Sequence, residues 1–146
     1  MLKHILLATD GSTASDHAAA LAVDLARSMG AKLTSLYAVD PYPYLAVGEM
    51  STEGVQHYMA AAQQEAAAAH AKVQALCNQG SSPVTLQTIV VEDRAVAKAI
   101  VENAISEGAE MIVVGSHGRT GIVKMMLGSI TTKVLAESTL PVLVAR

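Results

Sequence analysis

The chain has 146 residues, of which 51% are hydrophobic and 16% charged, and its formal net charge at pH 7 is −3. This composition is too apolar for a disordered chain, and no apolar run reaches the roughly 18 residues of a membrane span. The mild negative charge argues against a nonspecific nucleic-acid or membrane-surface role. Since the start of the chain is not a convincing signal peptide, we expect a cytoplasmic protein with a single domain over residues 1–146.

Short apolar runs alternate along the chain with segments of helical character. The pattern predicts strands over 3–10, 31–40, 82–93, 109–116 and 140–146, and helices within 11–30, 55–80, 94–108 and 129–138. Glycines at the ends of three helical segments serve as stop signals, and Ser12 or Thr13 can cap the first helix. The stretch "PYPYLAVGEMSTEG" (41–54) holds two prolines and two glycines, so we expect an excursion that forms a flap near the sheet.

Strict alternation of continuous apolar strands with helices predicts an α/β fold, a doubly wound parallel sheet with helices on both faces. In such sheets ligands bind beyond the carboxyl ends of the strands, where the strand order reverses. The loops after the first and fourth strands are therefore the candidate site. Their sequences are "TDGS" (9–12) and "GSHGRTGIVKMMLGS" (115–129).

The second of these loops is rich in glycine and leads into a helix. The stretch between Glu110 and Glu137, which includes this loop, contains basic residues and no carboxylate. Glycines let a ligand approach the backbone, and a helix N-terminus with hydroxyl groups suits an anion. The spacing fits neither a Walker A loop nor the Rossmann glycine pattern. From the residues alone, two interpretations stay open: a phosphate-binding loop, or a flexible connection with Ser129 as an ordinary N-cap.

The loop after the first strand also has two interpretations. Asp10 can accept hydrogen bonds from a sugar hydroxyl or a base amine, or help to hold a metal ion near phosphates. Alternatively, Asp10 forms a turn, and Ser12 or Thr13 caps the next helix. The predicted fold brings both loops to the same edge of the sheet.

The motifs "ILLATDGS", "VVGSHGRTGIVKMMLGSITTKVLAES" and "PVLVAR" resemble those of the universal stress protein family, over essentially the whole chain. The pattern G-x2-G-x9-G-S, typical of the ATP-binding members, is complete. The resemblance implies a five-stranded Rossmann-like sheet of order 3-2-1-4-5, with ATP between strands 1 and 4. The residues that it implies for ATP binding are Ala8, Thr9, Asp10, Val39, Val114, Gly115, His117, Gly118, Arg119, Gly128, Ser129, Ile130 and Thr131.

Within that resemblance, Asp10 would contact the adenosine end, and backbone groups of Val39 would read the adenine. Backbone and hydroxyl groups of residues 128–131 would bind phosphate. Mg²⁺ or Mn²⁺ would be held through the phosphates, with no protein-only metal site, and the apolar last strand would pair with its copy in a homodimer. We expect a stress-response regulatory module; the alternatives are a slow ATP hydrolase and a dimeric interaction module that binds another anion.

Overall fold

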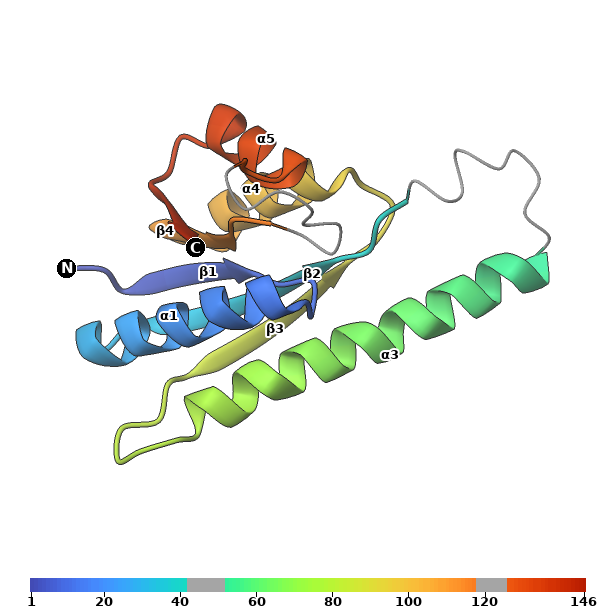
Figure 1. Ribbon diagram of the computed structural model, residues 1–146. Coiled ribbons are helices and arrows are strands. Elements are labelled where there is room, and N and C mark those ends of the chain that lie inside the picture. The colour runs from blue at the N-terminus through green and yellow to red at the C-terminus, as the bar shows by residue number, and fades with distance from the viewer. Residues whose placement is uncertain (42–51, 118–125) are drawn as a thin grey trace.

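The computed structural model describes residues 1–41, 52–117 and 126–146 (Figure 1). Its five strands form one sheet in the order β3-β2-β1-β4-β5, and every neighbouring pair is parallel. The fold predicted from the sequence is therefore confirmed. The strands are β1 (His4–Ala8), β2 (Lys32–Ala38), β3 (Leu86–Val91), β4 (Met111–Gly115) and β5 (Val142–Ala145).

Helices cover both faces of this sheet. They are α1 (Thr13–Met29), α3 (Thr52–Cys77), α4 (Val96–Ser106) and α5 (Ser129–Glu137). In Figure 1, α1 and α3 lie on one face of the sheet and α4 and α5 on the other. Side chains of a strand alternate between faces, so Ile5 and Leu7 pack on the α1 side, while Leu6 joins the α4 side. Among the described residues, none of the helices has the length and apolar character that a membrane crossing requires.

The ends of α1 follow from its sequence. Ser12, and not Thr13, is the N-cap, because its side chain accepts a hydrogen bond from the backbone N–H of Ser15. Gly30 ends the helix with a φ of 65°, a left-handed conformation that glycine adopts without strain. The helix therefore begins at a fixed point, directly after the loop that follows β1.

The predicted helix 55–80 is shifted by a few residues. It begins at Thr52, with Glu53 in its first turn, where a negative charge favours the helix dipole. It ends at Cys77, because the chain turns back at that point and Val84 donates its N–H to the Cys77 carbonyl. The predicted excursion thus overlaps the start of α3, and residues 42–51 lie outside the described part of the chain.

Two histidines are buried against opposite faces of β2. Nε2 of His4 lies 2.7 Å from Oγ1 of Thr34, and Nδ1 of His70 lies 3.0 Å from Oγ of Ser35. Nε2 of His70 is 3.2 Å from the Ile89 carbonyl, which can only accept, so this nitrogen carries the proton. Burial lowers the pKa of both imidazoles, and the charge of Lys32 lowers that of His4 further.

Candidate functional site

Two adjacent cavities open at the carboxyl ends of β1, β2 and β4. The α4-side cavity has a volume of about 70 Å³, and the α3-side cavity has about 430 Å³. They share five lining residues, so they form two parts of one cleft. The shared residues are Asp10, Ala38, Val96, Ile130 and Thr131.

The structure brings together the site residues that the sequence predicts. Each predicted residue within the described ranges lines one or both of the cavities. Gly118 and Arg119 lie outside those ranges. The α4-side cavity is lined by Ala8, Thr9, Asp10, Val114, Gly115, His117, Ile130 and Thr131 of the predicted set, and the α3-side cavity by Asp10, Val39, Gly128, Ser129, Ile130 and Thr131.

The loop after β1 holds its own shape and also lines the cleft. Oδ1 of Asp10 accepts a hydrogen bond of 2.9 Å from the Ser12 N–H, which is the turn that the alternative interpretation predicts. The hydroxyl of Thr9 donates to Oγ of Ser15 at 3.2 Å, and Gly11 has a φ of 77°. Because Asp10 lines both cavities as well, the turn and a role in ligand binding are compatible.

Gly115, at the end of β4, is required by a close approach of two backbones. A Cβ atom at this position would lie 3.1 Å from the carbonyl oxygen of Ala14 in α1 and 3.3 Å from its carbonyl carbon. A side chain here would press on the Ala14 backbone, so the start of α1 would have to move away from β4 by a few tenths of an ångström. The glycine therefore sets the separation of the two loops that form the cleft.

The start of α5 lines the cleft with residues 128–131. Its N-cap is Gly128, with φ −61° and ψ 155°, and it has no side-chain cap hydrogen bond among the described residues. The interpretation of Ser129 as an ordinary N-cap is therefore wrong, since Ser129 is the first residue of the helix. Thr132 N–H donates to the Gly128 carbonyl at 3.0 Å, so the amides of residues 129–131 precede the first intrahelical bond.

Hydrogen bonds within the fold limit which atoms of Thr131 and Val39 can bind a ligand. The hydroxyl of Thr131 donates to the Gly115 carbonyl at 2.7 Å, so its proton serves the fold and only its backbone N–H stays a donor for phosphate. The N–H of Val39 donates to the Val91 carbonyl at 2.8 Å, which leaves the Val39 carbonyl as its backbone group for a base. The Val39 side chain is buried in the core between β2 and α3.

His117 is held by its neighbour in the sequence. Its Nδ1 lies 2.8 Å from the hydroxyl oxygen of Ser116, whose side chain is buried. Both backbone groups of Ser116 are also bonded, the N–H to the Ala145 carbonyl and the carbonyl to the Gly128 N–H. The half-buried imidazole therefore lines the α4-side cavity next to a backbone segment that hydrogen bonds hold in place.

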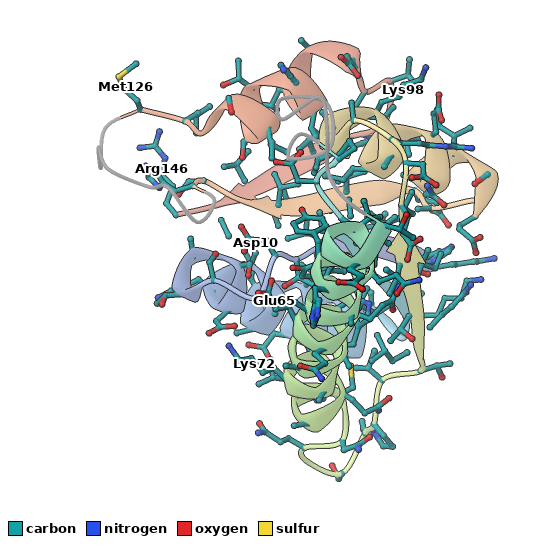
Figure 2. The ribbon with its side chains drawn as sticks, turned by 90° about the vertical axis from the view of Figure 1, so that its right-hand side faces the viewer. Asp10, Glu65, Lys72, Lys98, Met126 and Arg146 are labelled. Atoms are coloured by element: carbon teal, nitrogen blue, oxygen red, sulfur yellow. The ribbon has the colours of Figure 1, made fainter. Side chains whose placement is uncertain are left out.

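Sequence reasoning missed the wall of the cleft that α3 provides. Tyr58, Ala61, Ala62 and Glu65 line the α3-side cavity, at the spacing i, i+3, i+4, i+7 of one helical face. Glu65 accepts a hydrogen bond of 3.1 Å from the hydroxyl of the buried Tyr37. Figure 2 looks onto the carboxyl edge of the sheet and labels Asp10 and Glu65, which both line the α3-side cavity. The spacing of Tyr58 and Glu65 around the two alanines could have indicated this wall, but the sequence does not show which face of α3 lines the cleft.

A family model described as the universal stress protein family matches residues 1–146. The chain belongs to the universal stress protein family. It is 34% identical over 146 residues to a universal stress protein of Thermus aquaticus, with both chains fully covered. It is 32% identical over 147 residues to the universal stress protein MJ0531 of Methanocaldococcus jannaschii, and covers 83% of that protein. It is also 34% identical to the longer universal stress protein Rv2005c of Mycobacterium tuberculosis, of which it spans 45%.

Solved structures of the family have the same fold. The universal stress protein UspA from Lactobacillus plantarum has a TM-score of 0.82 and 26% identity, with 99% of this chain and 98% of that one covered. A universal stress protein in complex with cAMP has a TM-score of 0.69 at 24% identity, covering 99% and 97% of the two chains. One from Archaeoglobus fulgidus in complex with dAMP has 0.65 at 15% identity, covering 100% and 98%. At these identities, the last two structures show similarity of fold alone.

Proposed function

We propose that this chain is a regulatory module of the stress response that binds ATP in the cleft between β1 and β4. The observation that carries the proposal is the polarity of this cleft. One side presents the first-turn amides of α5, and the other side presents carboxylates at Asp10 and Glu65. A ligand with an anionic end and a neutral end rich in hydrogen-bond donors matches this polarity, and a nucleoside phosphate is such a ligand.

We assign the base to the α4-side part of the cleft, where this cavity is continuous with the larger α3-side cavity. Leu36, Ala38 and Ile100 give the α4-side cavity aliphatic walls, which suit a flat, largely apolar ring. Val39 lines the adjoining α3-side cavity, and its carbonyl can accept a hydrogen bond from an amino group of the base. Adenine carries such a group, and the two nucleotide complexes of this fold, with cAMP and dAMP, hold adenine nucleotides.

The phosphates belong at the start of α5. Amides before the first intrahelical bond and the positive end of the helix dipole favour an anion there. The chain between Glu110 and Glu137 contains no carboxylate that would repel phosphate, and it carries His117, Arg119 and Lys124. Serine at position 129, whose hydroxyl is not used for capping, adds a further donor.

A divalent cation would arrive with the nucleotide. No group of three or more His, Cys, Asp or Glu residues in the described part of the chain could hold a metal ion. Mg²⁺ or Mn²⁺ would therefore take its ligands chiefly from phosphate oxygens and water, as Mg²⁺ does in many nucleotide sites. The ion would neutralise phosphate charge in the cleft.

We further propose a homodimer through β5. This strand is the last in the order β3-β2-β1-β4-β5, so one of its edges faces away from the sheet. Exposed apolar side chains at Met126, Ile130 and Leu135 lie in α5 or just before it. Pairing of β5 with its copy would satisfy the open edge and cover apolar surface nearby.

The nucleotide carried by the purified protein tests the function. The protein is denatured, and the released small molecules are separated and identified; the proposal predicts ATP or its hydrolysis product ADP. Phosphate release at saturating ATP with Mg²⁺ then separates a binding module from a slow hydrolase. Absence of released nucleotide, together with no ATP binding by the refolded protein, would favour the interaction module that binds another anion.

A further inference from the structure

Glu65 is the acidic side chain that α3 contributes to the cleft. Besides the α3-side cavity, it lines a third cavity of about 280 Å³, and Asp10 lines both of these as well. The two carboxylates come from segments far apart in the sequence, one from the loop after β1 and one from the middle of α3. Both therefore line the two cavities, and Figure 2 labels both side chains at the carboxyl edge of the sheet.

Contacts on both sides hold Glu65 in this place. Its carboxylate accepts the hydrogen bond of Tyr37, whose side chain is 4% exposed and fixed by β2. Two turns further along α3, Nζ of Lys72 donates to the Gly11 carbonyl at 3.2 Å and pairs with Asp16 at 3.3 Å. The hydrogen bond from Lys72 to Gly11 joins α3 to the loop that carries Asp10. The fold therefore sets the position of Glu65 relative to Asp10.

The chemistry of a carboxylate restricts what Glu65 can contact in a nucleotide. It repels phosphates, and these have their place at α5, on the other side of the cleft. A carboxylate can accept about four hydrogen bonds, and Tyr37 supplies one of those that Glu65 accepts. If the base occupies the α4-side cavity and the phosphates lie at α5, the ribose lies between them, beside Asp10. The two ribose hydroxyls are neutral donors, and acidic side chains bind such hydroxyls in other nucleotide sites.

We propose that Glu65, together with Asp10, binds the 2′- and 3′-hydroxyls of the ribose and makes the cleft selective for ribonucleotides over deoxyribonucleotides. This inference rests on the proposed function, because it needs a nucleotide in the cleft. The competing explanation is that Glu65 has a purely structural role, for example as an acceptor for Tyr37. In that case its replacement would change stability but would not distinguish ribose from deoxyribose.

The test compares ATP, 2′-deoxy-ATP and 3′-deoxy-ATP by calorimetric titration. One hydrogen bond to a charged group corresponds to roughly tenfold in affinity, so the unaltered protein should prefer ATP to each deoxynucleotide by about that factor. Glu65→Ala should reduce this preference to about twofold, mainly by weakening ATP. Glu65→Gln keeps an acceptor for Tyr37 but loses the charge, so its preference should lie between the two.

Glu53→Gln is the matched control. It removes the same charge from an exposed position of the same helix, away from the lining of the cavities, and should keep the full preference. The inference is overturned if the unaltered protein binds ATP and the deoxynucleotides equally well. It is also overturned if Glu65→Ala weakens all three ligands by the same factor. A protein that binds none of the three contradicts the proposed function itself, so the two failures are distinguishable.

Discussion

The hydroxyl of Thr131 donates a hydrogen bond of 2.7 Å to the carbonyl oxygen of Gly115, and so joins the first turn of α5 to the last residue of β4. Most of the glycine-rich segment, residues 115–129, lies between these two residues in the sequence. Thr131 is buried, with 5% of the residue exposed, and the bond is partly buried. It therefore fixes the distance between the end of the strand and the amides that we assign to phosphate, whatever the conformation of the chain between them.

Replacing Thr131 by valine removes this bond while keeping the shape of the side chain. The Gly115 carbonyl loses this donor, so we expect the free energy of unfolding to fall by about 1 kcal/mol and the ATP affinity to fall several-fold. The control is Thr132→Val. Thr132 is exposed, and its hydroxyl donates to the carbonyl of Gly128, the N-cap of the same helix, so the free energy of unfolding should change by no more than about 0.5 kcal/mol. Equal effects of the two substitutions in urea unfolding would contradict this account of α5.

Alanine at position 115 tests the close approach of β4 and α1. The added Cβ would press on the Ala14 backbone, so we expect Gly115→Ala to lower both stability and ATP affinity. Gly30→Ala places alanine at a positive φ in open space, and it should cost about 1 kcal/mol of stability without changing affinity. The two variants are compared by thermal unfolding and by ATP titration. Unchanged affinity in Gly115→Ala would show that the separation of the loops does not govern binding.

The buried histidines predict how stability depends on pH. The pKa of His70 lies below the ordinary value of 6.5 in the folded state, because burial disfavours the charged ring. When the pH falls through the unfolded value, the unfolded chain takes up a proton that the folded chain does not. The free energy of unfolding should therefore decrease as pH falls from about 6.5 towards the lowered folded pKa, and His4 acts in the same direction.

Substitution separates this contribution from the other titrating groups. His70→Gln should flatten the pH dependence of urea unfolding, although it also removes buried hydrogen bonds and lowers stability at neutral pH. His17→Gln, at an exposed position of α1, should leave the slope as it is. A slope in His70→Gln that equals that of the unaltered protein would rule out the buried imidazole as its source.

The proposed dimer is tested by charge on the surface beside β5. Leu135 on α5 is 41% exposed, and Leu21 on α1, on the opposite face of the sheet, is 42% exposed, so they form a matched pair. We expect sedimentation to give a dimer for the unaltered protein and for Leu21→Glu. Leu135→Glu should shift the protein towards monomer, because it buries a charge at the interface. A monomeric unaltered protein at micromolar concentration would rule out the dimer.

Periodicity predicted the type and order of the described helices and strands, because apolar strands and amphipathic helices differ in period. The family motif supplied the strand order. The sequence was less informative about which face of α3 packs on the sheet, because its alanine-rich sequence offers several faces. Only the packing against β2 shows that Glu65 lines the same cavity as Asp10. Likewise, the sequence could not tell that Gly128, not Ser129, caps α5, since either residue type suits that position.

The measurement that tests the central claim most directly is an ATP titration of nucleotide-free protein, beside the variant Gly118→Val. Gly118 is the second glycine of the G-x2-G-x9-G-S motif and lies outside the described residues. The account predicts saturable binding of one ATP per chain in the unaltered protein. It predicts no ATP binding in Gly118→Val, with an unchanged circular dichroism spectrum and unchanged oligomeric state. Equal ATP affinity in the two proteins, or no binding by the unaltered protein, would contradict it.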